Sequence, residues 1–504
     1  MKKVKILISS LVLAMLFSNC DSYLSEVPDN RTQLDSEQKI AELLVSAYPS
    51  GMYIQFMEDY TDNVTDSGLL ASENVNNTQY YKWELGDDVS VDSPSHYWDT
   101  CYAAIATANQ ALEALDELGD KISPSKREAL RSEALLARAY AHFQLVLIWG
   151  KAYNPATAAS DLGVPYVDRV EGKLVQQYKR NTVAEVYEKI EADLVEGLKG
   201  ITNNYNVPQY HFNKNAANAL AVRFYLFKGE WDKVIKYSSY VGTKPGYNVI
   251  RDVKTWSGTS SYVEAWQAYS RTLEPTNILL ATGNSYASRT PSRVRFTMTG
   301  ALKNKLVTRV NNPLAAKDYY WNRLMLSANQ QQTVFLPKHW EYFKLDNPSA
   351  GTGYGYTTDM LFTNDEVYLN RIEALVMEKR YDEAKTELEY FLGTRTNGYN
   401  ASSDKLSLNR IKSLYTYNPD ELTPFYPIDS EEQWYWLKTI LEVKRIEQLQ
   451  EGKRWFDIKR FNIVVTHQYV DGSGVDVLEK DDLRRQLPLP LHVVASGVQD
   501  NPKK

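Results

Sequence analysis

The sequence predicts a mainly α-helical protein, built from helix pairs that carry long, irregular, aromatic-rich insertions. Three observations support this fold class. Apolar residues recur at helical spacing along much of the chain, two helix-pair segments repeat at a fixed offset, and residues 243–360 lose this periodicity while gaining Gly, Ser, Thr, Asn and Pro. With 504 residues, 43% of them hydrophobic, the chain is long enough to bury a large core.

The N-terminal residues 1–19 have the pattern of a secretory signal. Lys2, Lys3 and Lys5 precede a mostly apolar run at 6–17, which is too short to remain as a membrane-spanning helix, and Cys20 follows shortly after. One interpretation is cleavage before Cys20 and acylation of its sulfur and amine, where several acyl chains would hold the protein on a membrane. The other is an ordinary signal with a different cleavage site and an incidental cysteine.

Charge and cysteine content do not support a nucleic-acid-binding protein or a fold held by disulfides. The formal charge is −6, and removal of the signal would take away three more positive charges, so the composition does not support a nucleic-acid partner. The chain has two cysteines, Cys20 and Cys101, so acylation of Cys20 would leave no intramolecular disulfide. Cys101 lies in an Ala-rich amphipathic stretch, and we expect it to be a small core residue.

Three segments of the first half have helical periodicity. Residues 99–118 carry an apolar stripe at spacings of three and four, and residues 123–150 begin with Ser and Pro and stay amphipathic up to Gly150. Residues 181–198 begin with an Asn or Thr cap. We expect a helix in each.

Two later segments, 221–241 and 371–391, align without gaps at an offset of 150 residues. In each, a helix ends at a short turn, and an aromatic-Asp pair opens a second helix: Trp231-Asp232 or Tyr381-Asp382. This pattern is typical of tetratricopeptide-like units in degenerate form. Two unrelated helical hairpins are the alternative.

Aromatic residues indicate a binding surface. Tyr (36) far exceeds Phe (14), and Tyr offers a hydroxyl beside a flat apolar ring. We expect an aromatic loop at 349–358 ("SAGTGYGYTT"), which is not a phosphate-binding loop because neither helix nor strand clearly flanks it in the required order. We expect a similar aromatic loop, rich in Asn and Asp, at 76–88. As a pooled prediction, in which packing is the alternative for each residue, the ligand-binding side chains are Tyr80, Tyr81, Trp83, Trp256, Trp266, Tyr286, Tyr320 and Trp321.

No catalytic motif is present in the sequence. The six histidines form no HExxH, and there is no GxSxG elbow, P-loop or calcium loop, although a distant pair of carboxylates for glycoside hydrolysis is not identifiable from sequence. The densest charged stretch, 441–462, places Glu442 near Arg445 and Lys444 near Glu447 within one helical turn. It is either a helix corner held by ion pairs or a ligand site.

In these charged residues the chain resembles the SusD/RagB family of nutrient-binding outer-membrane lipoproteins of Bacteroidetes. The resemblance includes the lipobox-like end at Cys20, "VYLNRIEAL" (367–375), and "QLPLP" (486–490) followed by "QDNP" (499–502). The family motif of Glu, Arg, Glu-x-Leu, Glu-Gly-x-Arg and Asp-x-Lys-Arg is matched at Glu442, Arg445, Glu447, Leu449, Glu451, Gly452, Arg454, Asp457, Lys459 and Arg460. The region 243–360 matches only loosely.

The resemblance implies a right-handed scaffold of about four tetratricopeptide-like helix pairs. It implies a signal peptide at 1–19, an N-terminal helical region at 20–242, and a C-terminal region at 243–504 with ligand loops at 243–360, packed as one unit. The protein would be anchored by lipid (palmitate) at Cys20 on the outer face of the outer membrane. It would pass oligosaccharides or peptides to a SusC-like TonB-dependent transporter, without catalysis, cofactor or metal. A surface glycoside hydrolase and a tetratricopeptide-like assembly scaffold are the alternatives.

Overall fold

The computed structural model describes residues 34–68, 74–84, 86–172, 177–241, 250–259, 261–328 and 332–502. The predicted signal at 1–19 and the predicted lipidation site Cys20 therefore lie outside the described residues.

The first half of the protein is helical, and the predicted helices are confirmed. The capping box of Thr182 and Glu185 starts one helix, and Cys101 is buried in another as a small core residue. The helices are α3 (Glu37–Leu44), α4 (Ile54–Asp59), α5 (Val75–Tyr81), α6 (Pro94–Leu118), α7 (Pro124–Trp149), α8 (Val183–Gly200), α9 (Lys214–Lys228) and α10 (Trp231–Ser238).

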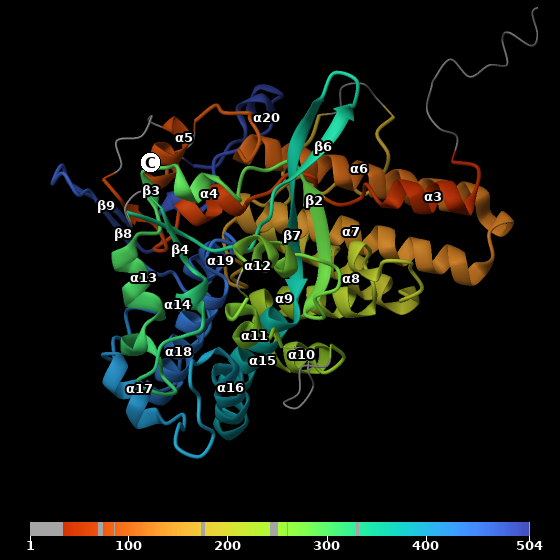
Figure 1. Cartoon of the computed structure of the whole chain (residues 1–504). Helices are drawn as coiled ribbons and strands as arrows, with labels where there is room; N and C mark the ends of the chain where they lie inside the picture. Colours follow the sequence, from red (N-terminus) through yellow and green to blue (C-terminus); the bar gives the residue numbers. More distant parts are fainter. Residues whose placement is uncertain are drawn as a thin grey trace, which may run out of the picture.

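Helices of the second half complete the scaffold: α15 (Asn364–Met377), α16 (Tyr381–Arg395), α17 (Leu408–Leu414), α18 (Glu431–Glu447), α19 (Arg454–Arg460) and α20 (Leu491–Ala495). Helices close in sequence pack on each other, α6 on α7, α9 on α10, α15 on α16 and α17 on α18. Figure 1 shows α3, α6, α7 and α8 side by side in one part of the molecule, with α16, α17 and α18 in another. The fold is mainly α and tetratricopeptide-like, as predicted.

The repeat at an offset of 150 residues is visible in the backbone. Gly229, after α9, is in the left-handed conformation with φ 74°, and Lys379, at the equivalent place after α15, has φ 58°. In both units the following aromatic residue, Trp231 or Tyr381, is the first residue of the second helix. The two segments are thus two helix pairs with the same turn, because a left-handed residue ends the first helix in each.

Between these repeated units lie four short helices and most of the strands. The helices are α11 (Val253–Ser257), α12 (Tyr262–Tyr269), α13 (Gly300–Val307) and α14 (Trp321–Leu324). The strands of the described residues are β1 (Thr65–Asp66), β2 (Asn277–Gly283), β3 (Phe296–Thr297), β4 (Leu326–Ala328), β5 (Thr333–Phe335), β6 (Tyr342–Asn347), β7 (Thr352–Thr363), β8 (Val465–Gln468) and β9 (Val475–Leu478). They form an antiparallel sheet in the order β2-β7-β6 and the two-stranded pairs β1-β3, β4-β5 and β8-β9.

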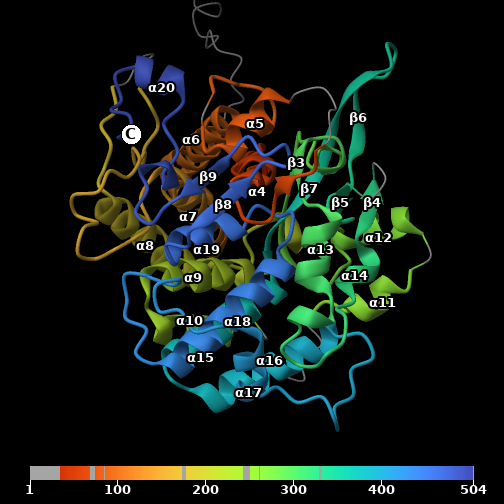
Figure 2. The same cartoon turned by 90° about the vertical axis from the view of Figure 1, so that its left-hand side faces the viewer.

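The two segments predicted as aromatic loops are regular in part, so the predictions were wrong for residues 76–81 and 352–358. Residues 352–358 belong to β7, whose hairpin with β6 projects from the body of the protein (Figure 2). Residues 76–81 belong to α5, which the side chain of Asn74 caps by accepting from the backbone N–H of Asn77 at 3.1 Å. In the first case alternating glycines hide the strand pattern. In the second, the Asn residues that favour turns also cap helices.

The charged stretch at 441–462 forms a buried corner of the scaffold, and the prediction of a helix corner held by ion pairs is confirmed. Gly452, with φ 68°, lies in the turn between α18 and α19. Glu442 and Arg445 form the expected pair, at 3.6 Å between Oε2 and Nη1. Lys444 instead reaches Glu373 of α15, with 2.5 Å between Nζ and Oε2, so the strongest pairs connect distant segments.

We call the buried ion pairs around this corner the charged core. Glu373 accepts from both Lys444 and Arg460, and Arg395 bridges Glu447 at 2.7 Å and Asp365 at 2.6 Å. Each side chain in it is buried. The members are Arg223, Lys338, Asp365, Glu366, Glu373, Arg395, Lys444, Glu447, Glu451, Lys453 and Arg460.

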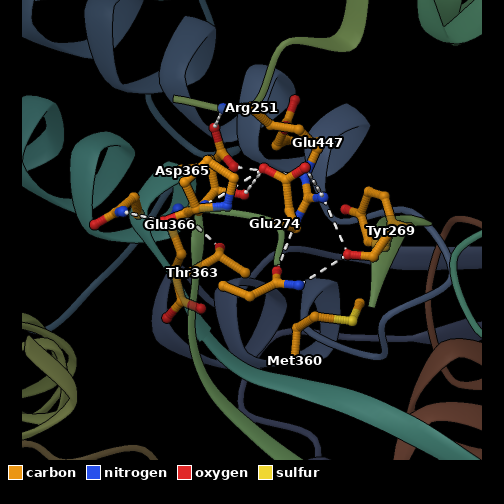
Figure 3. A network of polar contacts seen from close by, with 12 residues as sticks. Arg251, Tyr269, Glu274, Met360, Thr363, Asp365, Glu366 and Glu447 are labelled. Carbon is orange, nitrogen blue, oxygen red and sulfur yellow. Dashed lines mark hydrogen bonds and ion pairs between the residues drawn. The ribbon is translucent and has the colours of Figure 1, made fainter. Parts of the chain in front are cut away.

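Each charge of the charged core is neutralised by a neighbour. Around Asp365, the backbone N–H of Arg251 donates to its carboxylate at 3.1 Å, and the Arg251 guanidinium lies over the Tyr269 ring (Figure 3). Burial by itself raises the pKa of Glu373, but the charges of Arg460 and Lys444 hold that pKa well below its usual range. The carboxylate is therefore ionised, and removing one partner would leave buried charge uncompensated.

The C-terminal segment closes the scaffold over the end of α7. Lys459 donates through Nζ to the carbonyls of Leu147 at 2.5 Å and Gly150 at 2.8 Å, and Asn501 donates through Nδ2 to the Trp149 carbonyl at 2.8 Å. The last carbonyls of a helix lack partners within it, and these side chains supply them. Burial lowers the pKa of Lys459 to about 7.

One continuous hydrophobic core includes residues from Ile40 to Val498. The predicted division at 242 and 243 stays a prediction, because residues 242–249 lie outside the described ones. Within the described part of the chain, no helix combines the length and apolarity needed to cross a membrane.

Candidate functional site

A cleft of about 840 Å³ lies against one face of the β2-β7-β6 sheet. Its floor comes from β6, β7 and the end of β2, and its walls come from residues 270–272, Tyr210, His96 of α6 and Ser50. The cleft therefore joins the projecting hairpin to the helical scaffold, and segments far apart in sequence meet in it.

Strand alternation decides which side chains of the hairpin enter this cleft. Successive residues of a strand point to opposite faces, and Tyr342 and Lys344 of β6 line the cleft while Phe343 does not. Their partners across the hairpin are Tyr356 and Tyr354. The rings of Tyr342 and Tyr356 are stacked, with 5.5 Å between centroids and 24° between planes. Both are half-buried, so the pair presents aromatic surface to the cleft.

Polar atoms without partners complete the cleft. Among the described residues, His96 Nδ1 and Asn284 Oδ1 are buried and make no hydrogen bond, and both residues line the cleft. Burial lowers the pKa of His96, which favours the neutral imidazole. A buried polar atom without a partner is costly, and both atoms lie beneath the surface of the cleft.

At Gly283 the end of β2 lies very close to Ser50, and this contact shapes the wall of the cleft near Ser50. A Cβ atom at this position would lie 2.1 Å from the carbonyl oxygen of Ser50, which is far inside van der Waals contact. Only glycine lets β2 lie this close to the segment before α4. The relative position of Asn284 and Ser50 in the cleft depends on this contact.

Three of the predicted ligand-binding residues, Tyr80, Tyr81 and Trp83, are buried near β8. The Tyr81 ring is stacked between Phe296, at 4.0 Å, and His467, at 3.9 Å. The indole N–H of Trp83 donates to the Tyr60 carbonyl at 2.9 Å. In this structure these rings pack in the interior and do not line the cleft.

Trp256, Tyr320 and Trp321 are also buried, beside the charged core. The indole N–H of Trp321 donates to the Glu447 carboxylate at 3.1 Å, and that of Trp256 donates to the Ala265 carbonyl at 2.8 Å. Two tryptophans of the irregular region 243–360, Trp256 and Trp321, are therefore packing residues in this structure.

The remaining two predicted residues, Trp266 and Tyr286, keep partly exposed rings. Tyr286 is 42% exposed, and the Arg289 guanidinium lies over its ring at 4.5 Å. Trp266 packs against Phe335 and Trp340, each at 5.6 Å between centroids. Neither lines the cleft, so the structure does not gather the eight residues at one site, and ligand contact by any of them stays a prediction.

The tyrosines that do line the cleft were missed by sequence reasoning. Tyr354, Tyr356 and Thr358 alternate with Gly353, Gly355 and Thr357, which is the period-two pattern of a strand with one bare face. That signal was available but weak, because glycine is unfavourable in strands and favours the interpretation as a loop. The pairing of this segment with Tyr342 depends on contacts across the hairpin.

A second cleft, of about 650 Å³, lies beside the closing segment and is lined by charges of both signs. Lys151 pairs with Asp161 at 2.7 Å, and Asp482 pairs with Arg484 at 2.6 Å. Both carboxylates already have a cation beside them, which makes the tyrosine-lined cleft the better candidate site.

Within the described residues, no group of three or more His, Cys, Asp and Glu side chains is arranged to hold a metal ion.

Comparison with known sequences gives two findings. A SusD-like family model, described as "Starch-binding associating with outer membrane", matches residues 22–226. SusD-like protein P2 of Formosa agariphila is 27% identical over 162 residues, which is 31% of this chain and 28% of that protein. The match thus spans well under a third of this relative.

Comparison with solved structures extends over nearly the whole chain. A SusD superfamily protein from Bacteroides thetaiotaomicron covers 94% of this chain and 100% of its own, with a TM-score of 0.67 and 19% identity. A putative sugar binding protein from Bacteroides vulgatus covers 92% and 97%, with a TM-score of 0.68 and 19% identity. A laminarin binding SusD-like protein covers 93% and 100%, with a TM-score of 0.58 and 15% identity. At these identities the structures show a shared fold.

Proposed function

Because this chain belongs to the SusD/RagB family, we propose that it is a cell-surface lipoprotein that binds nutrient oligosaccharides in the tyrosine-lined cleft. It would deliver them to a SusC-like TonB-dependent transporter of the outer membrane and would not transform them. The laminarin binding SusD-like protein with the same fold supports a carbohydrate ligand.

The observation that carries this proposal is the stacked pair of Tyr342 and Tyr356 on the floor of the cleft. A sugar ring has apolar C–H faces and a rim of hydroxyl groups. Aromatic rings cover the faces, and polar lining residues such as Thr272, Thr282 and Asn284 would bond with the rim. By analogy with aromatic pairs, each such ring contributes about 0.5–1.5 kcal/mol.

The lining of the cleft also favours binding over hydrolysis. Glycoside hydrolysis uses a pair of Asp or Glu side chains on either side of the scissile bond. The described lining contains Ser, Thr, Tyr, Asn and basic side chains and no carboxyl group. Release of reducing sugar from any polysaccharide by the purified protein would contradict a non-catalytic role.

Neighbouring residues on opposite faces of β6 test the site. Tyr342 lines the cleft, whereas Phe343, which is 61% exposed, lies on the other face. In affinity electrophoresis or calorimetry against a panel of glycans, we expect Tyr342→Ala to weaken binding by about tenfold. Phe343→Ala is the matched control and should bind as the wild type does. Equal effects of the two substitutions on affinity would show that the ligand does not bind in this cleft. No binding to any glycan of the panel would contradict the proposed function.

The membrane anchor is tested separately, since Cys20 lies outside the described residues. We expect mass spectrometry of the mature N-terminus to find an acylated Cys20, and Cys20→Ala to release the protein from the membrane fraction. An unmodified N-terminus would contradict the anchor. Co-purification of a TonB-dependent transporter from native membranes tests the partner, and its absence would favour a different role for the helical scaffold.

A further inference from the structure

The charges of the tyrosine-lined cleft all have one sign. Arg271 and Lys344 are its charged lining residues, and no described lining residue is acidic. The whole chain is acidic, with a formal charge of −6. A cationic cleft in an acidic protein is a local arrangement, because the average charge of the surface would predict the opposite sign.

Neither cation is neutralised by the protein. Among the described residues, no carboxylate forms an ion pair with Arg271 or Lys344, and both side chains are exposed. Lys344 lies 5.9 Å from the centre of the Tyr354 ring, which places its ammonium at the aromatic floor. The two charges thus differ from those of the charged core, where each guanidinium or ammonium has a carboxylate partner.

Nearby carboxylates are committed to other groups. Glu341 lies on the opposite face of β6 by strand alternation and pairs with Arg289 at 3.0 Å. Glu274 accepts from the Thr276 hydroxyl at 2.9 Å, and Asp99 pairs with His492 at 2.9 Å. Asp346 lies in the irregular part of β6 toward the hairpin tip, accepts from the Thr352 hydroxyl at 3.2 Å and does not line the cleft.

We infer that the natural ligand of this cleft is an acidic oligosaccharide, one that carries carboxylate or sulfate groups on its sugar rings. This inference rests on the proposed function and specifies its ligand class. The tyrosine pair would cover a sugar face, and Arg271 and Lys344 would each meet an anionic substituent. An anion on the ligand gives these exposed cations the partner that the protein does not supply, and arginine can bind it in bidentate fashion.

The floor favours a sugar over an acidic peptide. Tyr342 and Tyr356 line the cleft with half-buried rings, and aromatic rings pack on the apolar C–H faces of sugars. A peptide would be expected to pair with an exposed strand edge or to fill side-chain pockets. An acidic peptide is therefore an outcome of the test and not the inference.

The experiment uses the mature chain and four probes of similar length: an oligogalacturonate, its carboxyl-reduced neutral counterpart, a sulfated galacto-oligosaccharide and a polyglutamate peptide. We expect calorimetry to detect at least one acidic oligosaccharide, with affinity that falls as sodium chloride is raised. The two acidic sugars distinguish carboxylate from sulfate as the recognised group. The neutral counterpart should bind at least tenfold more weakly.

Charge-removing variants locate the effect. Lys344→Gln and Arg271→Gln should each weaken binding of the acidic sugar by about fivefold. Lys385→Gln, which removes an exposed lysine from α16, is the matched control and should bind as the wild type does.

Each contrary outcome has a distinct meaning. Equal binding of the neutral and acidic sugars, or wild-type affinity in both cleft variants, would overturn the acidic ligand and leave the proposed function intact. Binding of polyglutamate alone would replace the sugar by a peptide and overturn the inference. If no sugar of the wider glycan panel binds, the proposed function fails, and the inference fails with it.

Discussion

The charged core and the tyrosine-lined cleft are built from the same kinds of residue and differ in how their charges are compensated. In the charged core, Arg395 is 1% exposed and contacts two carboxylates. In the cleft, Lys344 is exposed and has no carboxylate partner among the described residues. A buried, fully paired charge holds segments together, whereas an exposed, unpaired charge is free to meet a ligand. The densest charged motif of this sequence is therefore structural.

The largest effect is expected in the charged core. Glu373→Gln would leave Lys444 and Arg460 buried without this carboxylate, so we expect the free energy of unfolding to fall by about 3–5 kcal/mol. Urea denaturation measures it. Glu378→Gln, at an exposed position just after α15, is the control and should change stability by less than about 0.5 kcal/mol. A loss as small as the control's would mean that the charged core does not hold the scaffold.

Backbone geometry at the corner gives the next effect. Gly452 has φ 68°, and a Cβ there would lie 3.0 Å from the Ile54 carbonyl oxygen and from Met57 Cβ. We expect Gly452→Ala to lower the free energy of unfolding by about 1–3 kcal/mol, because the positive φ strains the backbone of alanine and the new Cβ contacts its neighbours too closely. Gly472 has a similar φ of 73° and nothing within 4 Å of its Cβ position. Gly472→Ala should therefore lower the free energy of unfolding by less. Equal losses in the two variants would show that the close contact at Gly452 does not contribute to the effect.

One acid at the corner, Glu58, forms no ion pair among the described residues and gives a pH dependence. Glu58 accepts from the backbone N–H groups of Gln450 and Gly452, and burial raises its pKa to about 7 from an ordinary 4.5. Between these values the folded state binds more protons than the unfolded state, so stability falls as pH rises. The limit for one group is about 1.4 kcal/mol per pH unit.

Glu58→Gln isolates this contribution. Relative to the wild type, the variant should become more stable as pH rises from about 4.5 to 7, measured by urea denaturation at several pH values. Parallel stability curves for the two proteins would contradict a raised pKa at Glu58. The comparison is with the charged core, where Glu373 has the opposite shift because cations surround it.

The smallest effect is expected in the cleft. Lys344→Gln and Arg271→Gln should change the free energy of unfolding by less than about 0.5 kcal/mol, because neither side chain has an ion-pair partner to lose among the described residues. Thermal denaturation of the binding-deficient variants measures this. A loss of more than about 1 kcal/mol in either would place that cation in the structural network and remove the contrast between the two regions.

Sequence reasoning predicted the helical scaffold well, because its signals are local. Caps such as Thr182 and the apolar stripes of α6 and α7 act within a few residues, and so does the turn shared by Gly229 and Lys379. The motif at 442–460 was predicted as a corner from the spacing of its charges within a helical turn. Its main partners, such as Glu373 and Arg395, come from other helices, and spacing gives no information about them.

The candidate site was predicted less well, because exposure of an aromatic ring is not a local property. Trp321 and Tyr81 looked like surface residues in irregular segments, and both are buried. The tyrosines of the cleft lie on β6 and β7. A strand forms only when it pairs with another strand, and that partner can lie at any distance along the sequence. A loop and a strand with glycine on one face have the same local composition.

By itself, the sequence predicted a helical scaffold with two similar helix pairs and a helix corner held by ion pairs, and it supported the family. Helices can be predicted in this way because their backbone hydrogen bonds join residues four apart and their apolar residues recur with a local period. Only the tertiary structure decided which rings and which cations face solvent together, since hairpin pairing, the Gly283 contact and the walls around His96 join segments distant in sequence.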